Sequence, residues 1–298
     1  MLEYAWYCAM EADIKLFLDY LANEKKYSQN TLAAYHNDLT QLAEYVRSAN
    51  VAAGRGPSEP KLNAELLSGY VYSLKERKYK PSTVARKIAA AKSCLKFMVD
   101  RGRLRGDLAP NLASPQVSKP LPKPLSVSEV RRLLSEAAKL STIDAKRDKT
   151  MLEVLYGTGL RASELMALNT RDIDLRKNTL RCMGAGSKSR VIPLEPSVSR
   201  LIKEYIDVVR PDLLTNEKEV ALFLNRRGER LTRQGFWQIV QGYADKVGLS
   251  GKVTPRSLRH SFAAHKLKNG AELESVQELL GHAHISTTRA YTQVEPRT

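Results

Sequence analysis

The chain has 298 residues, enough for one large domain or two ordinary ones that each bury a hydrophobic core. Lysine and arginine number 48 against 32 acidic residues, and the formal net charge of +16 favours DNA or RNA over an acidic membrane surface. No stretch reaches the roughly eighteen apolar residues of a membrane-spanning helix. Cys8, Cys94 and Cys182 lack Cys-x-x-Cys spacing, so we expect reduced, buried thiols in a cytoplasmic protein.

The first hundred residues have the apolar periodicity of a four-helix unit. The predicted helices cover residues 11–23, 32–49, 63–77 and 82–101. Polar and basic side chains gather where these helices begin, and such helix N-termini suit DNA phosphates. The candidate DNA contacts are Asn30, Thr31, Tyr35, Lys80, Ser82, Thr83, Arg86 and Lys87. For each one alone, an ordinary cap or a solvated basic face is the simpler interpretation.

Proline is frequent in residues 105–124, which predicts an extended, stiff linker with little capacity to pack a core of its own. We therefore expect a domain boundary there, between a helical domain at 1–104 and a second domain at 125–298.

The second domain is predicted to be mainly α with a small antiparallel sheet. Ser126 caps a first helix, and a second helix runs from Lys149 to Tyr156 and breaks at the turn Gly157–Gly159. Short strands are expected at 178–183, 190–194 and 220–224, the first two joined as a hairpin. Further helices are expected at 196–210, 232–246, 255–268, 272–280 and 284–292.

Four motifs of this domain carry groups suited to phosphoryl transfer. They are Gly-x-Gly-Leu-Arg-x-Ser-Glu-Leu at 157–165, Leu-Arg-His-Ser-Phe-Ala at 258–263, Leu-Leu-Gly-His at 279–282 and Ser-Thr-Thr-x-x-Tyr-Thr at 286–292. Arginine stays charged and binds phosphate oxygens in pairs, and a tyrosine hydroxyl can attack phosphorus. Core packing, or a basic surface that only holds phosphates, is the alternative for any one motif alone.

The ordered motifs together resemble the tyrosine recombinases, most of all the Xer-type enzymes that resolve chromosome dimers and the phage integrases, from about Asp13 to the end. The resemblance implies a SAM-like core-binding domain and a catalytic domain that form a C-shaped clamp on DNA, without metal or cofactor. It implies site-specific recombination through a 3′-phosphotyrosyl intermediate and a Holliday junction. The expected partners are duplex DNA with inverted half-sites and further copies of the chain, from dimer to tetramer, at the nucleoid. A partner recombinase or accessory protein stays open.

The same resemblance assigns roles to the motif residues. Arg161 and Arg259 would clamp the scissile phosphate, and Tyr291 would be the nucleophile. His282 would hydrogen-bond or orient the phosphate, and Glu164 would buttress Arg161 or its neighbours.

The chain departs from the family pattern at two positions. Ala185 stands where the family has the lysine that protonates the leaving 5′-oxygen, and loss of a general acid typically costs on the order of 10²–10⁴ in rate. Either the alanine is an introduced change that slows cleavage, or Lys188 takes over, although Lys188, like Arg190, better suits a DNA-phosphate contact. Arg256 stands where the family usually has histidine, and an arginine keeps the electrostatic role but cannot shuttle protons near neutral pH. We interpret His260 as a structural helix residue.

Seven residues follow Tyr291, where related proteins carry a further helix that docks on a neighbouring subunit. Either the chain is truncated or its subunits communicate another way. Two rival functions stay open: a DNA-binding protein with a degraded site that acts by occupancy, and a helix-turn-helix transcription regulator, in which Tyr291 would have no role.

Overall fold

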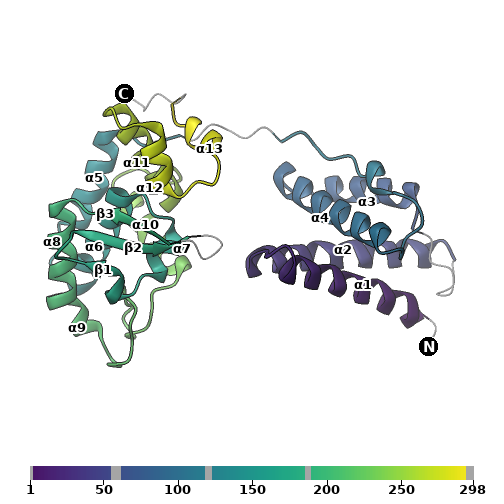
Figure 1. Ribbon diagram of the computed structural model, residues 1–298, viewed down its shortest axis with the longest axis horizontal. Coiled ribbons are helices and arrows are strands. Elements are labelled where there is room, and N and C mark those ends of the chain that lie inside the picture. Colours follow the sequence, from purple (N-terminus) through teal and green to yellow (C-terminus); the bar gives the residue numbers. More distant parts are fainter. Residues whose placement is uncertain (1–2, 55–61, 118–122, 185–188, 293–298) are drawn as a thin grey trace. The chain divides into compact units, whose positions relative to one another are not determined.

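The computed structural model describes residues 3–54, 62–117, 123–184 and 189–292. The chain divides into two compact units, Met1–Lys119 and Pro120–Thr298 (Figure 1). Each unit has its own hydrophobic core. Within the described ranges, no helix is both long enough and apolar enough to cross a lipid bilayer.

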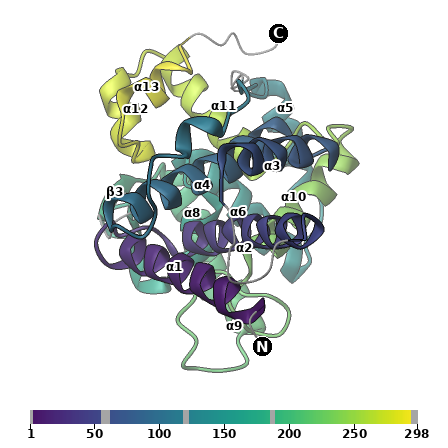
Figure 2. The same cartoon turned by 90° about the vertical axis from the view of Figure 1, so that its right-hand side faces the viewer.

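Four helices build the N-terminal unit, as the periodicity predicts. They are α1 (Glu3–Asn23), α2 (Gln29–Ala52), α3 (Ala64–Glu76) and α4 (Pro81–Asp100). Helix α1 packs along α2, and α4 packs against both (Figure 2). The side chains of Ser28 and Asn63 accept backbone N–H groups at the starts of α2 and α3, and Pro81 occupies the first turn of α4, where it costs no hydrogen bond.

The first half of the predicted linker packs against this helical unit. A short 3₁₀-helix, η1 (Ala109–Asn111), leads into Leu112, which is fully buried in the core of the four helices. Leu104 and Leu108 pack against the same core. Burial of these leucines holds residues 104–112 on the helical unit, which the proline content alone did not indicate.

The second unit is mostly helical. Its helices are α5 (Val127–Ala137), α6 (Ile143–Thr158), α7 (Ala162–Ala167), the 3₁₀-helix η2 (Thr170–Asp172), α8 (Pro196–Glu204), the π-helical segment η4 (Tyr205–Val209), α9 (Arg210–Leu213), α10 (Arg233–Lys246), α11 (Pro255–Lys268), α12 (Leu273–Leu280) and α13 (Ile285–Arg289). Helix α6 packs against α5, α8 and α11 and lies at the centre of the unit. The predicted fold class, mainly α with a small antiparallel sheet, is confirmed.

The sheet has three antiparallel strands in the order β1 (Ile173–Asp174), β2 (Thr179–Met183) and β3 (Ser189–Pro193). Leu180 pairs with Ile173 on one side and Ile192 on the other, and both Leu180 and Ile192 are buried. The prediction missed β1, and its strand at 220–224 is wrong: the segment makes only isolated bridges, including Asn169 to Ala221. This segment fills the core and makes no extended ladder.

Candidate active site

A buried carboxylate, Glu164, gathers the arginines of the second unit. Arg161 donates to it through Nη1 at 2.7 Å and through its backbone N–H at 2.8 Å. Arg190 donates through both terminal nitrogens at 2.9 and 2.8 Å, and Nη1 of Arg259 lies 3.7 Å away. Burial raises the pKa of the Glu164 carboxyl, but the hydrogen bonds and charges of Arg190 and Arg161 outweigh burial and lower it to about 2. One anion therefore holds three cations, and the cluster keeps a surplus of positive charge.

Backbone carbonyls at the ends of two helices fix the same arginines. Arg259 donates to the carbonyls of Gly159 and Leu280, each at 2.7 Å. Arg161 donates to the carbonyl of Gly281 at 3.2 Å, and Arg190 to that of Leu279 at 2.8 Å. The last carbonyls of a helix lack intrahelical partners and carry partial negative charge, so the C-termini of α6 and α12 are suited to guanidinium groups.

Two glycines allow the arginines and neighbouring side chains to lie close to the ends of α6 and α12. Gly159 ends α6 with a φ of 63°, and a Cβ there would lie 2.3 Å from a ring carbon of Phe262. Gly281 ends α12 with a φ of 62°, and a Cβ there would lie 2.9 Å from Nη1 of Arg190. The left-handed backbone and the lack of space both require glycine, so the Gly-x-Gly and Leu-Gly-His motifs shape the arginine cluster.

His282 lies between Arg259 and α13. Its Nε2 is 3.0 Å from Nη2 of Arg259, and its Nδ1 is 2.9 Å from the hydroxyl of the buried Thr288. Arginine has only donors, so Nε2 accepts and Nδ1 carries the proton of a neutral ring. Burial and the charge of Arg259 lower the pKa of His282 to about 4. At neutral pH the ring is uncharged and fixed in one tautomer.

Tyr291 follows α13 and points back toward α11. It is 4% exposed, and its ring stacks on His282 with centroids 6.2 Å apart. Burial raises the pKa of its phenol, and the charges of Arg259, Arg256 and Arg161 act in the opposite direction. A buried phenol needs such nearby positive charge before it can ionise.

His260 touches the tyrosine directly. Its Nδ1 lies 2.6 Å from Oη of Tyr291, and Nε of Arg256 donates to its Nε2 at 3.1 Å. Burial and the charges of Arg256 and Arg259 lower the pKa of His260 to about 4. The interpretation of His260 as a structural helix residue misses this contact. Its position four residues after Arg256, on the same face of α11, is the signal that could have indicated it.

These groups line one cavity of about 880 Å³. Arg161, Arg256, Arg259, His282 and Tyr291 all contribute to its wall. Helix α10 adds residues that the sequence did not single out: Arg233, Gln234 and the half-exposed Trp237. An arginine and an exposed indole beside the cluster extend it with one further cation and one aromatic face.

Three predicted site residues need separate mention. Ala185 and Lys188 lie outside the described residues. Arg190, expected to contact DNA, has its guanidinium occupied by Glu164 and the Leu279 carbonyl, and its side chain is 12% exposed. It therefore acts within the cluster as a brace for Glu164.

In the N-terminal unit, the candidate contacts fall into two groups. Asn30, Lys80 and Ser82 are exposed at the starts of α2 and α4, with Thr31, Tyr35 and Thr83 partly buried beside them. The other two, Arg86 and Lys87, form ion pairs with the buried Asp38 of α2, the lysine at 2.9 Å. Lys87 is itself buried, so its ammonium joins α4 to α2.

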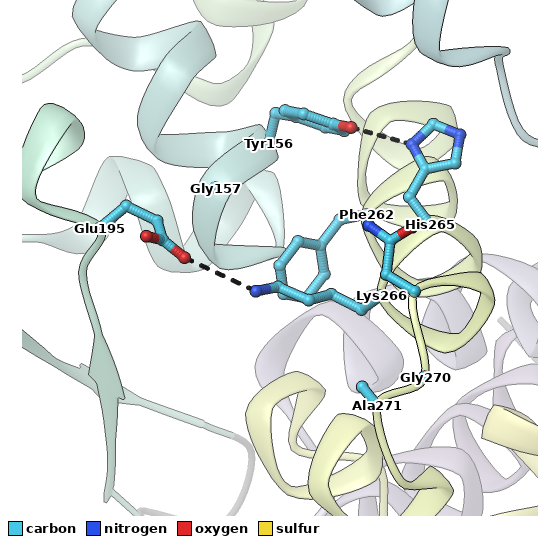
Figure 3. A pocket seen from close by; sticks show the side chains of 9 residues that line it. Tyr156, Gly157, Glu195, Phe262, His265, Lys266, Gly270 and Ala271 are labelled. Atoms are coloured by element: carbon cyan, nitrogen blue, oxygen red, sulfur yellow. Dashed lines mark hydrogen bonds and ion pairs between the residues drawn. The ribbon is translucent and has the colours of Figure 1, made fainter.

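A second cavity, of about 450 Å³, lies beside the C-terminal half of α11 (Figure 3). Oη of Tyr156 is 2.8 Å from Nδ1 of His265, and Nζ of Lys266 is 3.7 Å from Glu195. Most of the surface of this cavity is apolar, and its wall contains none of the arginines that bind Glu164. It is separate from the cavity that holds Tyr291.

Comparison with known proteins agrees with this geometry. Residues 123–297 match the phage integrase family, and residues 14–102 match the phage integrase N-terminal SAM-like domain. The chain belongs to the phage integrase family.

Individual relatives indicate which group within the phage integrase family the chain resembles. Tyrosine recombinase XerC of Herpetosiphon aurantiacus is 45% identical over 285 residues, which cover 96% of this chain and 91% of the relative. Tyrosine recombinase XerD of Oceanobacillus iheyensis is 40% identical over 295 residues, 99% of this chain and 95% of the relative. The structure of XerH bound to its difH substrate before cleavage has the same fold, with a TM-score of 0.72, 24% identity and coverage of 89% and 76%. The enzyme is a tyrosine recombinase of the Xer type.

Proposed function

We propose that this enzyme cleaves and rejoins duplex DNA at a site made of inverted half-sites. Tyr291 attacks a phosphodiester to form a 3′-phosphotyrosyl link, and strand exchange proceeds through a Holliday junction. A homo-oligomer, from dimer to tetramer, acts on the DNA, with one strand cleaved by each active subunit. A partner recombinase or an accessory protein could join this assembly. The observation that carries the proposal is the convergence of Tyr291 with Arg161, Arg256, Arg259 and His282 on one cavity.

The charges of this cavity suit the transition state. Attack on a phosphodiester adds negative charge to the non-bridging oxygens, and positioned cations stabilise that charge most where water is excluded. Arg161 is 39% exposed on its side chain and keeps donors free for a phosphate. Arg259 is buried, and the carbonyls of Gly159 and Leu280 orient its guanidinium before DNA binds.

His282 and Arg256 complete the phosphate site in this proposal. The neutral His282 ring accepts from Arg259 in the free enzyme, and a bound phosphate oxygen would compete for that arginine. Arg256 adds a permanent charge near the tyrosine. Glu164 and Arg190 stay behind the site and hold the clamping arginines in place.

The N-terminal unit supplies DNA affinity. The exposed polar groups at the starts of α2 and α4 suit phosphate contacts, since free helix N–H groups carry partial positive charge. Asn30, Lys80 and Ser82 are the strongest candidates because they are exposed, and Arg86 can still add charge beside them.

Ala185 leaves the departing 5′-oxygen without the proton donor that the family has at this position. Without a lysine at that position, the 5′-oxygen must take its proton from another donor, which predicts slow cleavage. This residue also favours a second function, in which the enzyme binds its site and acts by occupancy.

Covalent trapping distinguishes the two functions. Nicked suicide duplexes carrying a site that gel shift shows is bound would be incubated with the chain, with Ala185→Lys and with Tyr291→Phe. An SDS-resistant adduct that strengthens with lysine and vanishes with phenylalanine supports recombination. Tight binding with no adduct from either the chain or the lysine variant would leave occupancy as the function.

A further inference from the structure

The hydrogen bonds around His260 define which of its ring nitrogens carries the proton. Nε of Arg256 can only donate, and it points at Nε2 of His260 from 3.1 Å. Nε2 must therefore present its lone pair. A neutral imidazole has one N–H, so that proton is on Nδ1, the atom that lies 2.6 Å from Oη of Tyr291.

We propose that Arg256 fixes His260 as a hydrogen-bond donor to Tyr291, so that His260 stabilises the phenolate that attacks DNA. The inference rests on the proposed function, because it assigns His260 a role in tyrosine attack. In this tautomer His260 cannot remove the tyrosine proton. It prepares the nucleophile by favouring the charged form of the phenol, as hydrogen bonds to an anion do.

The surroundings of His260 support a neutral ring. Its charged and titratable neighbours are Arg256 and Arg259 on α11, Tyr291 after α13, and His282 after α12. Two of these are permanent cations, and burial adds to their effect, so the pKa of His260 falls to about 4. An imidazolium would also direct an N–H at Nε of Arg256, which offers no acceptor.

The donor offsets a specific difficulty at Tyr291. Burial raises the pKa of this phenol, which opposes formation of the nucleophile. A hydrogen bond from His260 stabilises the phenolate, and the guanidinium of Arg256 polarises the imidazole from behind. The positive charge of Arg256 thus strengthens the hydrogen bond that the ring of His260 donates to the tyrosine oxygen.

The step balances with water as the proton carrier. Tyr291 loses its phenolic proton to water, and its oxygen forms a bond to phosphorus. The bond from phosphorus to the 5′-oxygen breaks, and that oxygen keeps the electron pair and takes a proton from water. His260 donates throughout and ends the step in the tautomer in which it began.

Arg256 and His260 depend on each other in this arrangement. They are four residues apart on α11, so both side chains lie on one face of the helix. A neutral histidine at position 256 could present either a donor or an acceptor, whereas arginine always donates. The substitution at 256 therefore defines the role of the histidine one turn later.

The test uses a duplex with a 5′-bridging phosphorothiolate at the cleaved position, because a thiolate leaves without a general acid and Ala185 then has little influence. Single-turnover adduct formation would be followed from pH 6 to 10. His260→Phe keeps a ring but removes the donor. We expect this change to slow attack by about tenfold or more and to move the midpoint of the pH–rate profile upward. His260→Asn keeps a donor near Nδ1 and should recover most of the rate. Arg256→Met releases the tautomer and also removes a charge from the phosphate site, so it should be at least as slow as His260→Phe.

Two control variants test whether slower attack in His260→Phe comes only from a disturbed structure. His265→Phe makes the same change at a buried histidine of α11 outside the Tyr291 cavity, and it should leave the rate unchanged. Fluorotyrosine at position 291 ionises at lower pH and should recover attack in His260→Phe. Equal rates for the chain and His260→Phe, or an Asn variant as slow as the Phe variant, would overturn the inference and leave recombination intact.

A direct titration keeps the inference testable if no adduct forms. The phenol pKa of Tyr291 would be measured by ultraviolet difference against Tyr291→Phe, in the chain, His260→Phe and His260→Asn. A higher phenol pKa in His260→Phe than in the other two supports the donor. An unchanged pKa refutes it, whatever the outcome for cleavage.

Discussion

Each unit of this recombinase contains a buried carboxylate that binds cations, and the two carboxylates do different work. Asp38 in the helical unit pairs with Arg86 and Lys87, and the lysine is buried with it. Glu164 in the catalytic unit binds Arg161 and Arg190, with Arg259 close by. The first cluster joins two helices, whereas the second places two of its arginines, Arg161 and Arg259, at the wall of a cavity.

The difference comes from the partners of the cations. The ammonium group of Lys87 binds Asp38 and lies over the ring of Tyr79, so little of its charge is available to a ligand. Arg161 and Arg259 are held partly by neutral carbonyls, which orient a guanidinium without cancelling its charge. A buried cluster of cations therefore indicates an anion-binding site when neutral carbonyls hold part of the cations and leave their charge available to a ligand.

The largest effect is expected for Arg259→Lys. A lysine cannot donate to Gly159, Leu280 and a phosphate in one fixed geometry, and loss of one positioned donor costs about 10²–10³ in rate. The measurement is single-turnover adduct formation. Arg86→Lys, the matched change in the helical unit, should alter DNA affinity modestly and leave the adduct rate at saturating enzyme unchanged; equal losses would contradict the comparison.

Glu164→Gln and Asp38→Asn should each destabilise their own unit by about 3 kcal/mol, because each leaves buried cations without their anion. Urea unfolding followed by probes in each unit measures both effects. Only Glu164→Gln should also slow adduct formation, since it alone orients arginines at the cavity. Slower cleavage from Asp38→Asn at saturating enzyme would show that the two clusters are not independent.

Two glycines provide a smaller, matched test. Gly159→Ala forces a left-handed residue and a clash with Phe262, so we expect a loss of about 2 kcal/mol or more. Gly54→Ala has nearly the same φ, 66°, but open space around it, and should cost only about 1 kcal/mol. Thermal denaturation compares them. Equal costs would show that the contact with Phe262 is unimportant.

The last prediction concerns the pH dependence of stability. His260 and His282 have pKa values of about 4 in the folded enzyme, below the ordinary value of about 6.5, so the unfolded chain binds their protons first. Their contribution to stability is complete above pH 6.5 and declines as the pH falls toward 4. The thermal midpoint should drop by about ten degrees or more across this interval. His282→Gln should flatten that drop, and an unchanged slope would argue against a buried neutral ring.

Periodicity predicted the helices well, because their apolar faces build the two cores. It failed where the structure depends on tertiary pairing. The two-residue strand β1 is too short to show alternation, and the apolar segment 220–224 satisfies its backbone through single bridges. Leu112 also has no local signal for its burial against the helical unit.

The motifs predicted which residues would gather, since Arg161, Arg259, His282 and Tyr291 line one cavity. They also predicted that Glu164 would support Arg161 or its neighbours, but they did not predict the backbone carbonyls that hold the arginines. The carbonyls of Gly159 and Leu280 are backbone groups whose position depends on how two helices end. The motifs also did not predict the proposed role of His260, because that role depends on the hydrogen bond from Arg256 and not on its own motif.

Main-chain anchoring of the arginines has a consequence for how this enzyme can vary. Leu279 and Leu280 contribute carbonyl oxygens to Arg190 and Arg259, whatever side chains they carry. The side chain of the partly buried Leu279 can therefore change while Arg190 stays fixed, provided α12 ends at the same residue, whereas Leu280 is also constrained by its burial in the core. The residue at which α12 ends is therefore the feature that keeps the arginines aligned.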